Sequence, residues 1–116
     1  MFTLKYKTEI SSAHQLPNAY NEKCHNLHGH TYKVLVEIKT PVLVNDMVID
    51  FKLLKDRIDY FDHKNLNDLI TMPTTERLAE TLYYIILVAV TEAEIKNAKV
   101  KITVFESDKS SITYEN

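Results

Sequence analysis

Residues 31–39 read TYKVLVEIK, and this stretch decides the fold because its side chains alternate in character. The even positions are aromatic or aliphatic, whereas the odd positions are mostly polar: Tyr32, Val34, Val36 and Ile38 against Thr31, Lys33, Leu35, Glu37 and Lys39. A period of two predicts a β-strand with one face in the core and the other in contact with water.

The same alternation recurs at residues 2–10 and 99–105, and a shorter, weaker pattern at 111–114 predicts a fourth strand. The polar positions of the longer strands are mostly lysines with two opposing glutamates: Lys5, Lys7, Lys33, Lys39, Lys99 and Lys101 against Glu9 and Glu37. We expect this face to contact either bulk water or a water-filled lumen inside an oligomer.

Between the second and third strands the spacing of apolar residues changes to three and four, which is typical of a helix face: Phe51, Leu54, Ile58 and Phe61. Asp50 is placed to cap the start of this helix. A second helix is expected to begin near Thr74 and Thr75, directly after Pro73. Its residues 85–90 are apolar on all sides, which favours burial against other subunits.

The order of elements is therefore ββααββ, which predicts an α+β fold in which two helices cover one face of a four-stranded antiparallel sheet. A chain of 116 residues is expected to form one domain, residues 1–116. The net charge of −2 shows no basic excess for nucleic acid, and no apolar run is long enough for a membrane span. No leader is recognisable and the single cysteine suits a reducing compartment, so we expect a cytoplasmic protein.

The connection between the first two strands, residues 11–29, is long for a compact domain and rich in histidine. His28 and His30 flank the only glycine, Gly29, and project to the same face of a strand. Gly29 removes a side chain that could crowd the site and permits unusual backbone angles. If the first two strands pair, His14 lies close to both. Three imidazoles and one open position are typical of catalytic zinc, although copper, nickel or iron also accept this donor set.

Three further groups could carry chemistry. Cys24 precedes His28 by four residues, and a thiol near a metal can act as a base or can instead be a fourth ligand. Asp62 and His63 could form a proton-transfer pair if a turn brings their side chains together. Glu106 closes the third strand, where its carboxylate could accept two adjacent N–H groups of a ligand.

These residues resemble, in the same order, the motifs of the 6-pyruvoyltetrahydropterin synthase family. The matching motifs cover nearly the whole chain: Ser12-Ala-His14, Cys24-x-x-x-His28-Gly-His30, Val48-Ile-Asp-Phe51, Phe61-Asp-His63, Asn65-Leu-Asn67, Pro73-Thr-Thr-Glu76 and Val104-Phe-Glu106. The short spacing between Cys24 and His28 resembles the bacterial branch that makes 6-carboxytetrahydropterin for queuosine.

The resemblance implies a tunnelling fold, in which the sheets of several subunits form a barrel, and a homo-oligomer, favoured as a hexamer of two trimers with active sites at subunit interfaces. It implies Zn²⁺ on His14, His28 and His30, and a pterin triphosphate as substrate. It assigns Cys24 as the general base and Asp62 with His63 as the proton relay. Glu106 is implied to anchor the pterin ring, and Thr74, Thr75 and Glu76 to lie near it.

The reaction implied is the conversion of 7,8-dihydroneopterin triphosphate to 6-carboxytetrahydropterin, with release of acetaldehyde and triphosphate. Two alternatives stay open at this point. One is 6-pyruvoyltetrahydropterin synthesis, in which triphosphate is eliminated without acetaldehyde. The other is a zinc- or pterin-binding module that has no catalytic activity.

Overall fold

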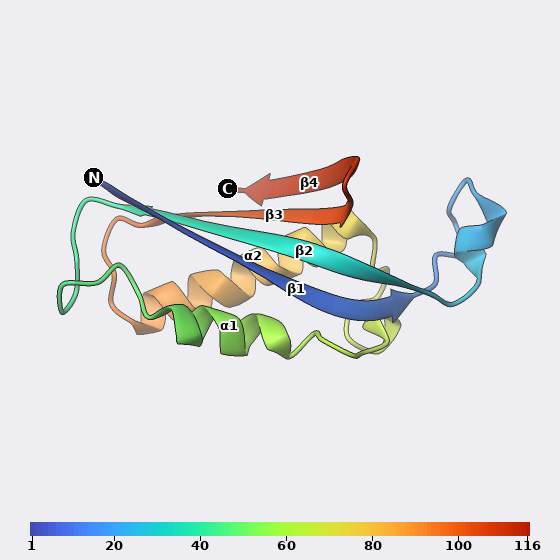
Figure 1. The fold of residues 1–116 in the computed structure, drawn as a ribbon, viewed down its shortest axis with the longest axis horizontal. Helices are drawn as coiled ribbons and strands as arrows, with labels where there is room; N and C mark the ends of the chain where they lie inside the picture. Colours follow the sequence, from blue (N-terminus) through green and yellow to red (C-terminus); the bar gives the residue numbers. More distant parts are fainter.

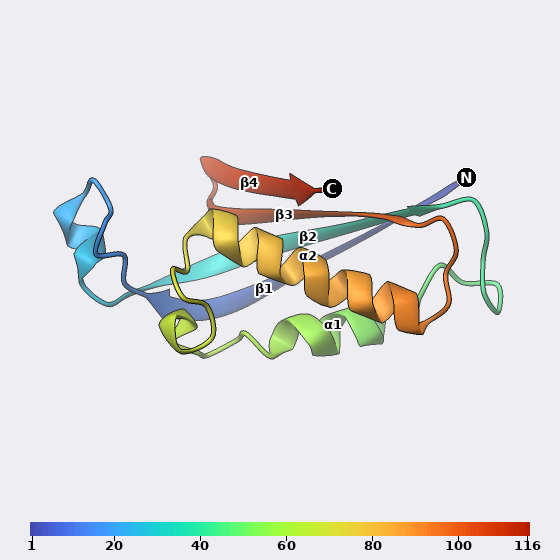
Figure 2. The same cartoon turned by 180° about the vertical axis from the view of Figure 1, so that it is seen from behind.

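The computed structural model describes all 116 residues and has a four-stranded sheet in the order β1-β2-β3-β4, with every neighbouring pair antiparallel. The strands are β1 (Phe2–His14), β2 (His28–Thr40), β3 (Lys99–Ser107) and β4 (Ser110–Glu115). Both helices, α1 (Phe51–Asp59) and α2 (Thr75–Glu92), cover the same face of the sheet (Figures 1 and 2). The predicted fold class and element order are therefore confirmed.

The first hairpin is longer than the alternation of apolar residues predicted. The pairing of β1 with β2 continues past Ile10 as far as His14, which lies directly opposite His28. The connection that we expected at residues 11–29 thus shrinks to residues 15–27, which include the short 3-10 helix η1 (Glu22–His25). This loop projects beyond the end of the sheet (Figure 1). The pattern failed here because Ser12 and His14 are polar and yet occupy the inward positions of the strand.

The inward face of the sheet carries the core. Tyr32, Val34, Val36 and Ile38 of β2 are fully buried, and the even positions of β3 from Val100 to Val104 are buried with them. The lysines of the odd positions lie on the opposite face, where Lys5 and Lys101 both approach Glu37 at 3.8 Å. The alternation therefore assigned the two faces correctly.

The helix starts also agree with the sequence. The Asp50 carboxylate accepts a hydrogen bond from the Lys52 backbone N–H at 2.9 Å, and the Thr74 hydroxyl accepts one from Arg77 N–H at 3.1 Å. Phe51 belongs to the predicted apolar helix face but is 55% exposed; it is the first residue of α1 and stacks on Tyr6. No helix is both long and apolar enough to cross a membrane.

Helix α2 supplies a large part of the core, since Leu82 and Ile86 are both fully buried. We expect Leu82→Ala to lower the free energy of unfolding by about 2–5 kcal/mol, because it deletes buried methyl groups and leaves a cavity. Val88, on the same helix, is 50% exposed, so Val88→Ala should change it by less than about 0.5 kcal/mol. Urea titration of both variants tests this difference, and equal losses would contradict the assigned orientation of α2.

Candidate metal centre

The three predicted histidines come together at the end of the inward face of the sheet. One ring nitrogen from each of His14, His28 and His30 lies within 4.8 Å of the other two. Cross-strand pairing explains this proximity, because His14 is opposite His28 and His30 is opposite Ser12 in the β1–β2 register. His14 is fully buried, and the other two are partly buried.

Backbone carbonyls set the protonation of two of these rings. His14 Nδ1 is 2.7 Å from the carbonyl oxygen of Pro73, and His28 Nδ1 is 2.7 Å from that of Asn26. A carbonyl oxygen only accepts hydrogen bonds, so each Nδ1 carries a proton, and in the neutral form of each ring the lone pair is on Nε2. These carbonyl contacts had no signal in the sequence, since they depend on the main chain and not on residue type.

The resulting arrangement of nitrogen atoms suits a metal cation. The Nε2 atoms of His14 and His28 are 3.0 Å apart, so when both rings are neutral their lone pairs repel unless a proton or a metal cation lies between them. His30 Nε2 is buried and has no hydrogen-bond partner. Burial lowers the pKa of His30; Glu106 acts in the opposite direction, and His14 and His28 lower the pKa further, so this ring also stays neutral. Three neutral imidazoles fit zinc with one open position.

Cys24 is not part of this cluster. It is a partly buried free thiol in η1, on the projecting loop, where its carbonyl accepts a hydrogen bond from Leu16 N–H at 2.7 Å. A site closed by this thiol as a fourth ligand is thus not formed in a single chain. The neighbouring His25 also lies outside the cluster and bonds the Ala19 carbonyl through Nε2 at 2.9 Å.

Asp62 and His63 do form the pair that the sequence left conditional on a turn. His63 adopts a φ of 55°, and its Nδ1 lies 2.9 Å from Asp62 Oδ2. The pair is fixed to the outer edge of β1, where Ser11 N–H donates to Asp62 Oδ1 at 2.7 Å and His63 N–H donates to the Ser11 carbonyl at 2.7 Å. The His63 side chain is 83% exposed.

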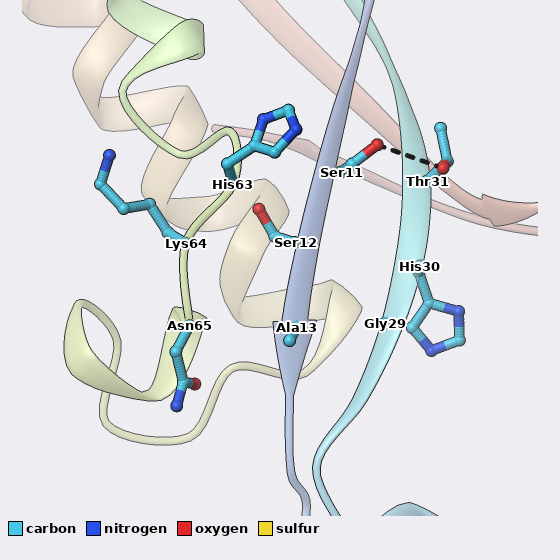
Figure 3. A pocket seen from close by; sticks show the side chains of 9 residues that line it. All are labelled: Ser11, Ser12, Ala13, Gly29, His30, Thr31, His63, Lys64 and Asn65. Atoms are coloured by element: carbon cyan, nitrogen blue, oxygen red, sulfur yellow. Dashed lines mark hydrogen bonds between the residues drawn. The ribbon is translucent and has the colours of Figure 1, made fainter.

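An open cleft of about 580 Å³ runs across this end of the sheet. His63 and His30 both line it, and Figure 3 shows them on opposite sides of β1, with the Ser11 and Thr31 hydroxyls joined at 3.3 Å between the strands. In a single chain, the Asp62–His63 pair and the histidine cluster therefore do not touch, and each contributes one residue to this cleft, His63 and His30.

The Ser11 contact gives Asp62 a testable pH dependence. Hydrogen bonds from Ser11 N–H and from His63 lower the pKa of Asp62, and desolvation opposes them only in part. Because the pKa of Asp62 is lower in the folded protein than in the unfolded chain, Asp62 stabilises the fold above the unfolded-chain pKa of about 3.9. This stabilisation is lost as the pH falls through the pKa of the folded protein. We expect Asp62→Asn to flatten the acid limb of a plot of unfolding free energy against pH, with little change in its slope above pH 6. An acid limb as steep as that of the wild type would contradict the contact.

Glu106 lies at the inner side of the cluster. Its Oε1 is 3.6 Å from His30 Nε2, and its Oε2 accepts a short hydrogen bond from the Thr75 hydroxyl. Glu106 and Thr75 line a small pocket of about 290 Å³ together with four other residues: Glu76, Ser110, Ser111 and Ile112. Thr74 does not line it, because its hydroxyl caps α2.

Two residues near the cluster were missed by the sequence reasoning. Ser12 donates a short buried hydrogen bond to the Phe61 carbonyl and so joins the end of β1 to the segment that carries Asp62. Tyr32 is fully buried next to His14 and His30. Burial raises the pKa of Tyr32 and the charge of Glu106 raises it further, so its hydroxyl keeps its proton. The alternation of polar and apolar positions placed Tyr32 on the inward face, but it gave no such signal for Ser12, which lies beyond the predicted end of the first strand.

Gly29 does not use the unusual backbone angles that a glycine permits. It has no positive φ, and a Cβ built there would meet only the Ser12 carbonyl oxygen at 3.7 Å. Glycine in a strand is about 0.5–1 kcal/mol less favourable than alanine. We therefore expect Gly29→Ala to fold with equal or slightly higher stability and to bind metal as the wild type does. Thermal unfolding and metal titration test this, and a loss above about 2 kcal/mol would contradict it.

Comparison with known proteins agrees with the fold. Residues 3–116 match the family described as 6-pyruvoyl tetrahydropterin synthase. Relatives named as 6-carboxy-5,6,7,8-tetrahydropterin synthases include a putative one of Archaeoglobus fulgidus, 38% identical over 66% of this chain and 68% of that protein. One of Bacillus subtilis is 30% identical over 97% of this chain and 84% of that protein.

Among solved structures, the 6-pyruvoyl tetrahydropterin synthase of Caenorhabditis elegans is 25% identical, with a TM-score of 0.75, over 99% of this chain and 95% of that one. The sheet, the helices and the three-histidine cluster thus define an α+β protein of the tunnelling-fold type with a candidate metal centre. The chain belongs to the 6-pyruvoyl tetrahydropterin synthase family.

Proposed function

We propose that this protein is a cytoplasmic zinc enzyme, a lyase that converts 7,8-dihydroneopterin triphosphate to 6-carboxy-5,6,7,8-tetrahydropterin and releases acetaldehyde and triphosphate, in queuosine biosynthesis. The observation that carries the metal part is the pair of Nε2 lone pairs, on His14 and His28, held 3.0 Å apart by carbonyl contacts on the opposite ring nitrogens. The names of the bacterial and archaeal relatives support the choice of product.

His14, His28 and His30 would hold the zinc. When bound, it would supply a Lewis acid and a template for oxygens of the substrate side chain. Glu106 has the geometry of a ring anchor, because its carboxylate is held by Thr75 at one oxygen and lines a pocket. The 2-amino group and N3–H of a pterin form a pair of adjacent donors that a carboxylate can accept together. We assign Thr75 and Glu76 to the same pocket, and Thr74 to its support through the helix cap.

The proton transfers are proposed to use Cys24 and His63. A thiolate at Cys24 would remove a proton from the substrate side chain. His63, oriented through Nδ1 by the Asp62 carboxylate, would return a proton from its other nitrogen. The His63 side chain is 83% exposed and lines an open cleft, so it could reach a substrate that enters this cleft.

Cys24, His63 and the metal cluster do not converge within one chain, so we propose that neighbouring copies complete each site. A homo-oligomer, favoured as a hexamer of two trimers, would bring the exposed Asp62–His63 edge of one copy toward the cluster and loop of another. The exposure of Tyr20 and Leu27 on the Cys24 loop, 103% and 55%, supports contacts of this loop beyond its own chain.

Product analysis tests the choice of reaction. Incubation of the zinc-loaded protein with 7,8-dihydroneopterin triphosphate should release acetaldehyde and triphosphate in equal amounts. Triphosphate without acetaldehyde would contradict the proposal and favour 6-pyruvoyltetrahydropterin synthesis. Tight pterin binding with neither product would favour a module that has no catalytic activity.

A further inference from the structure

Tyr32 is the largest fully buried side chain of the protein, and it lies against the metal cluster. It follows His30 by two residues on β2 and therefore projects to the same face of the sheet. The centroid of its ring is 5.5 Å from that of His30 and 6.1 Å from that of His14. Tyr32 thus packs against two of the three proposed ligands at once.

The hydroxyl of Tyr32 has an unusual environment for a buried phenol. Its oxygen is 3.3 Å from His14 Nδ1 and 3.5 Å from His14 Nε2. Nearly equal distances to both nitrogens put the oxygen to one side of the imidazole and not on the lone-pair axis of either nitrogen. His14 Nδ1 also already donates to the Pro73 carbonyl at 2.7 Å. The hydroxyl therefore has only long hydrogen-bond contacts to the ring, at 3.3 and 3.5 Å.

A buried tyrosine hydroxyl usually has a hydrogen-bond partner, because an unpaired one is destabilising. In contrast, the more exposed Tyr84 and Tyr114 pair their hydroxyls at 3.2 Å. A phenylalanine at position 32 would fill the same space without this penalty, so packing alone does not account for the oxygen. A contribution to metal binding does, since the partial negative charge of the oxygen lies against a ring that becomes more positive when its Nε2 binds a cation.

We propose that Tyr32 is a positioning residue for the metal centre, whose ring and hydroxyl hold His14 and His30 in the orientation that presents their nitrogens to the ion. The Pro73 carbonyl fixes which nitrogen of His14 is protonated, and Tyr32 restricts the rotation of the same ring. Groups that orient metal ligands in this way typically contribute 10- to 100-fold to metal affinity. The inference rests on the proposed metal site but not on the proposed reaction.

Tyr32→Phe separates this role from packing, because it keeps the ring and removes only the hydroxyl. We expect its dissociation constant for Zn²⁺, measured by competition with a chromophoric chelator, to rise about tenfold. The visible absorption of the Co²⁺-loaded protein should also shift, since the His14 ring is less well oriented. The metal-free variant should unfold at the same temperature as the metal-free wild type or at a higher one. If the hydroxyl only stabilised the fold, its removal would lower the unfolding temperature instead.

Tyr83→Phe is the matched control. Tyr83 is 5% exposed and packs against Tyr84 and Tyr114, far along the sheet from the histidines, so its variant should keep the wild-type affinity and spectrum. Tyr32→Leu, which removes the ring as well, should weaken binding more than Tyr32→Phe. Wild-type affinity and an unchanged Co²⁺ spectrum in Tyr32→Phe would overturn the role of Tyr32 alone. A wild-type protein that binds neither Zn²⁺ nor Co²⁺ would instead contradict the metal site itself.

Discussion

Zinc affinity is expected to fall about a hundred- to a thousandfold in His28→Ala. Zinc sites with four ligands contribute about 10–16 kcal/mol, so the loss of one ligand removes about 2.5–4 kcal/mol. His28 is the ligand best suited to this test because it is only partly buried, whereas His14 is fully buried and its loss would also disturb the core. Equilibrium competition with a chelator measures the change, and turnover should fall with metal occupancy.

The same substitution should have the opposite effect on the metal-free protein. At a pH at which both rings are neutral, the Nε2 lone pairs of His14 and His28 face each other at 3.0 Å, so removal of one imidazole relieves their repulsion. In chelator, His28→Ala should therefore unfold at the same temperature as the wild type or above it. His25→Ala is the control, since His25 is nearby but bonds the Ala19 carbonyl and lies outside the cluster. Unchanged zinc affinity in His28→Ala would contradict the three-histidine site.

Cys24→Ala should retain zinc and lose turnover by a factor of about 10²–10⁴, which is the usual contribution of a catalytic acid or base. The thiol is not among the clustered ligand atoms, so its removal leaves the three imidazoles intact. Lys23→Ala, in the same 3-10 turn and exposed, should keep both zinc and activity. Loss of zinc in Cys24→Ala would identify the thiol as a ligand and would contradict its role as a base.

Mixing two inactive variants tests whether copies share each site. Cys24→Ala and His63→Ala lack different groups, so after mild dissociation and reassembly together they should recover part of the activity. Some sites then receive an intact Cys24 from one copy and an intact Asp62–His63 pair from another. Absence of any recovery, with reassembly shown by a distinguishable tag on each variant, would contradict sites that lie between copies.

Much of this architecture could be predicted because it depends on periodicity. The alternation from Tyr32 to Ile38 assigned the buried face of β2 correctly, and Asp50 and Thr74 cap the two helices as their residue types predict. The convergence of His14 with His28 and His30 followed from pairing the first two strands. These features depend on local spacing, which a single sequence displays.

The remaining features depend on contacts that the sequence does not display. The extension of β1 to His14 was missed because its inward residues are polar, and they are polar because they build the site. The carbonyls of Pro73 and Asn26 act through the main chain. The turn at His63, with a φ of 55°, requires the edge of β1 to hold it. Cys24 lies outside the histidine cluster of its own chain, so its proposed role depends on contacts between copies, and the spacing of residues in one sequence does not display such contacts.

The most direct test of the central claim is turnover by one preparation before and after metal removal. The chelated protein, the same protein reconstituted with one equivalent of Zn²⁺, and a chelated sample given Mg²⁺ are each incubated with 7,8-dihydroneopterin triphosphate. We predict that acetaldehyde and 6-carboxytetrahydropterin form only in the zinc sample. Equal product in the chelated sample, or no product in any sample although Zn²⁺ is bound, would contradict a zinc-dependent pterin synthase.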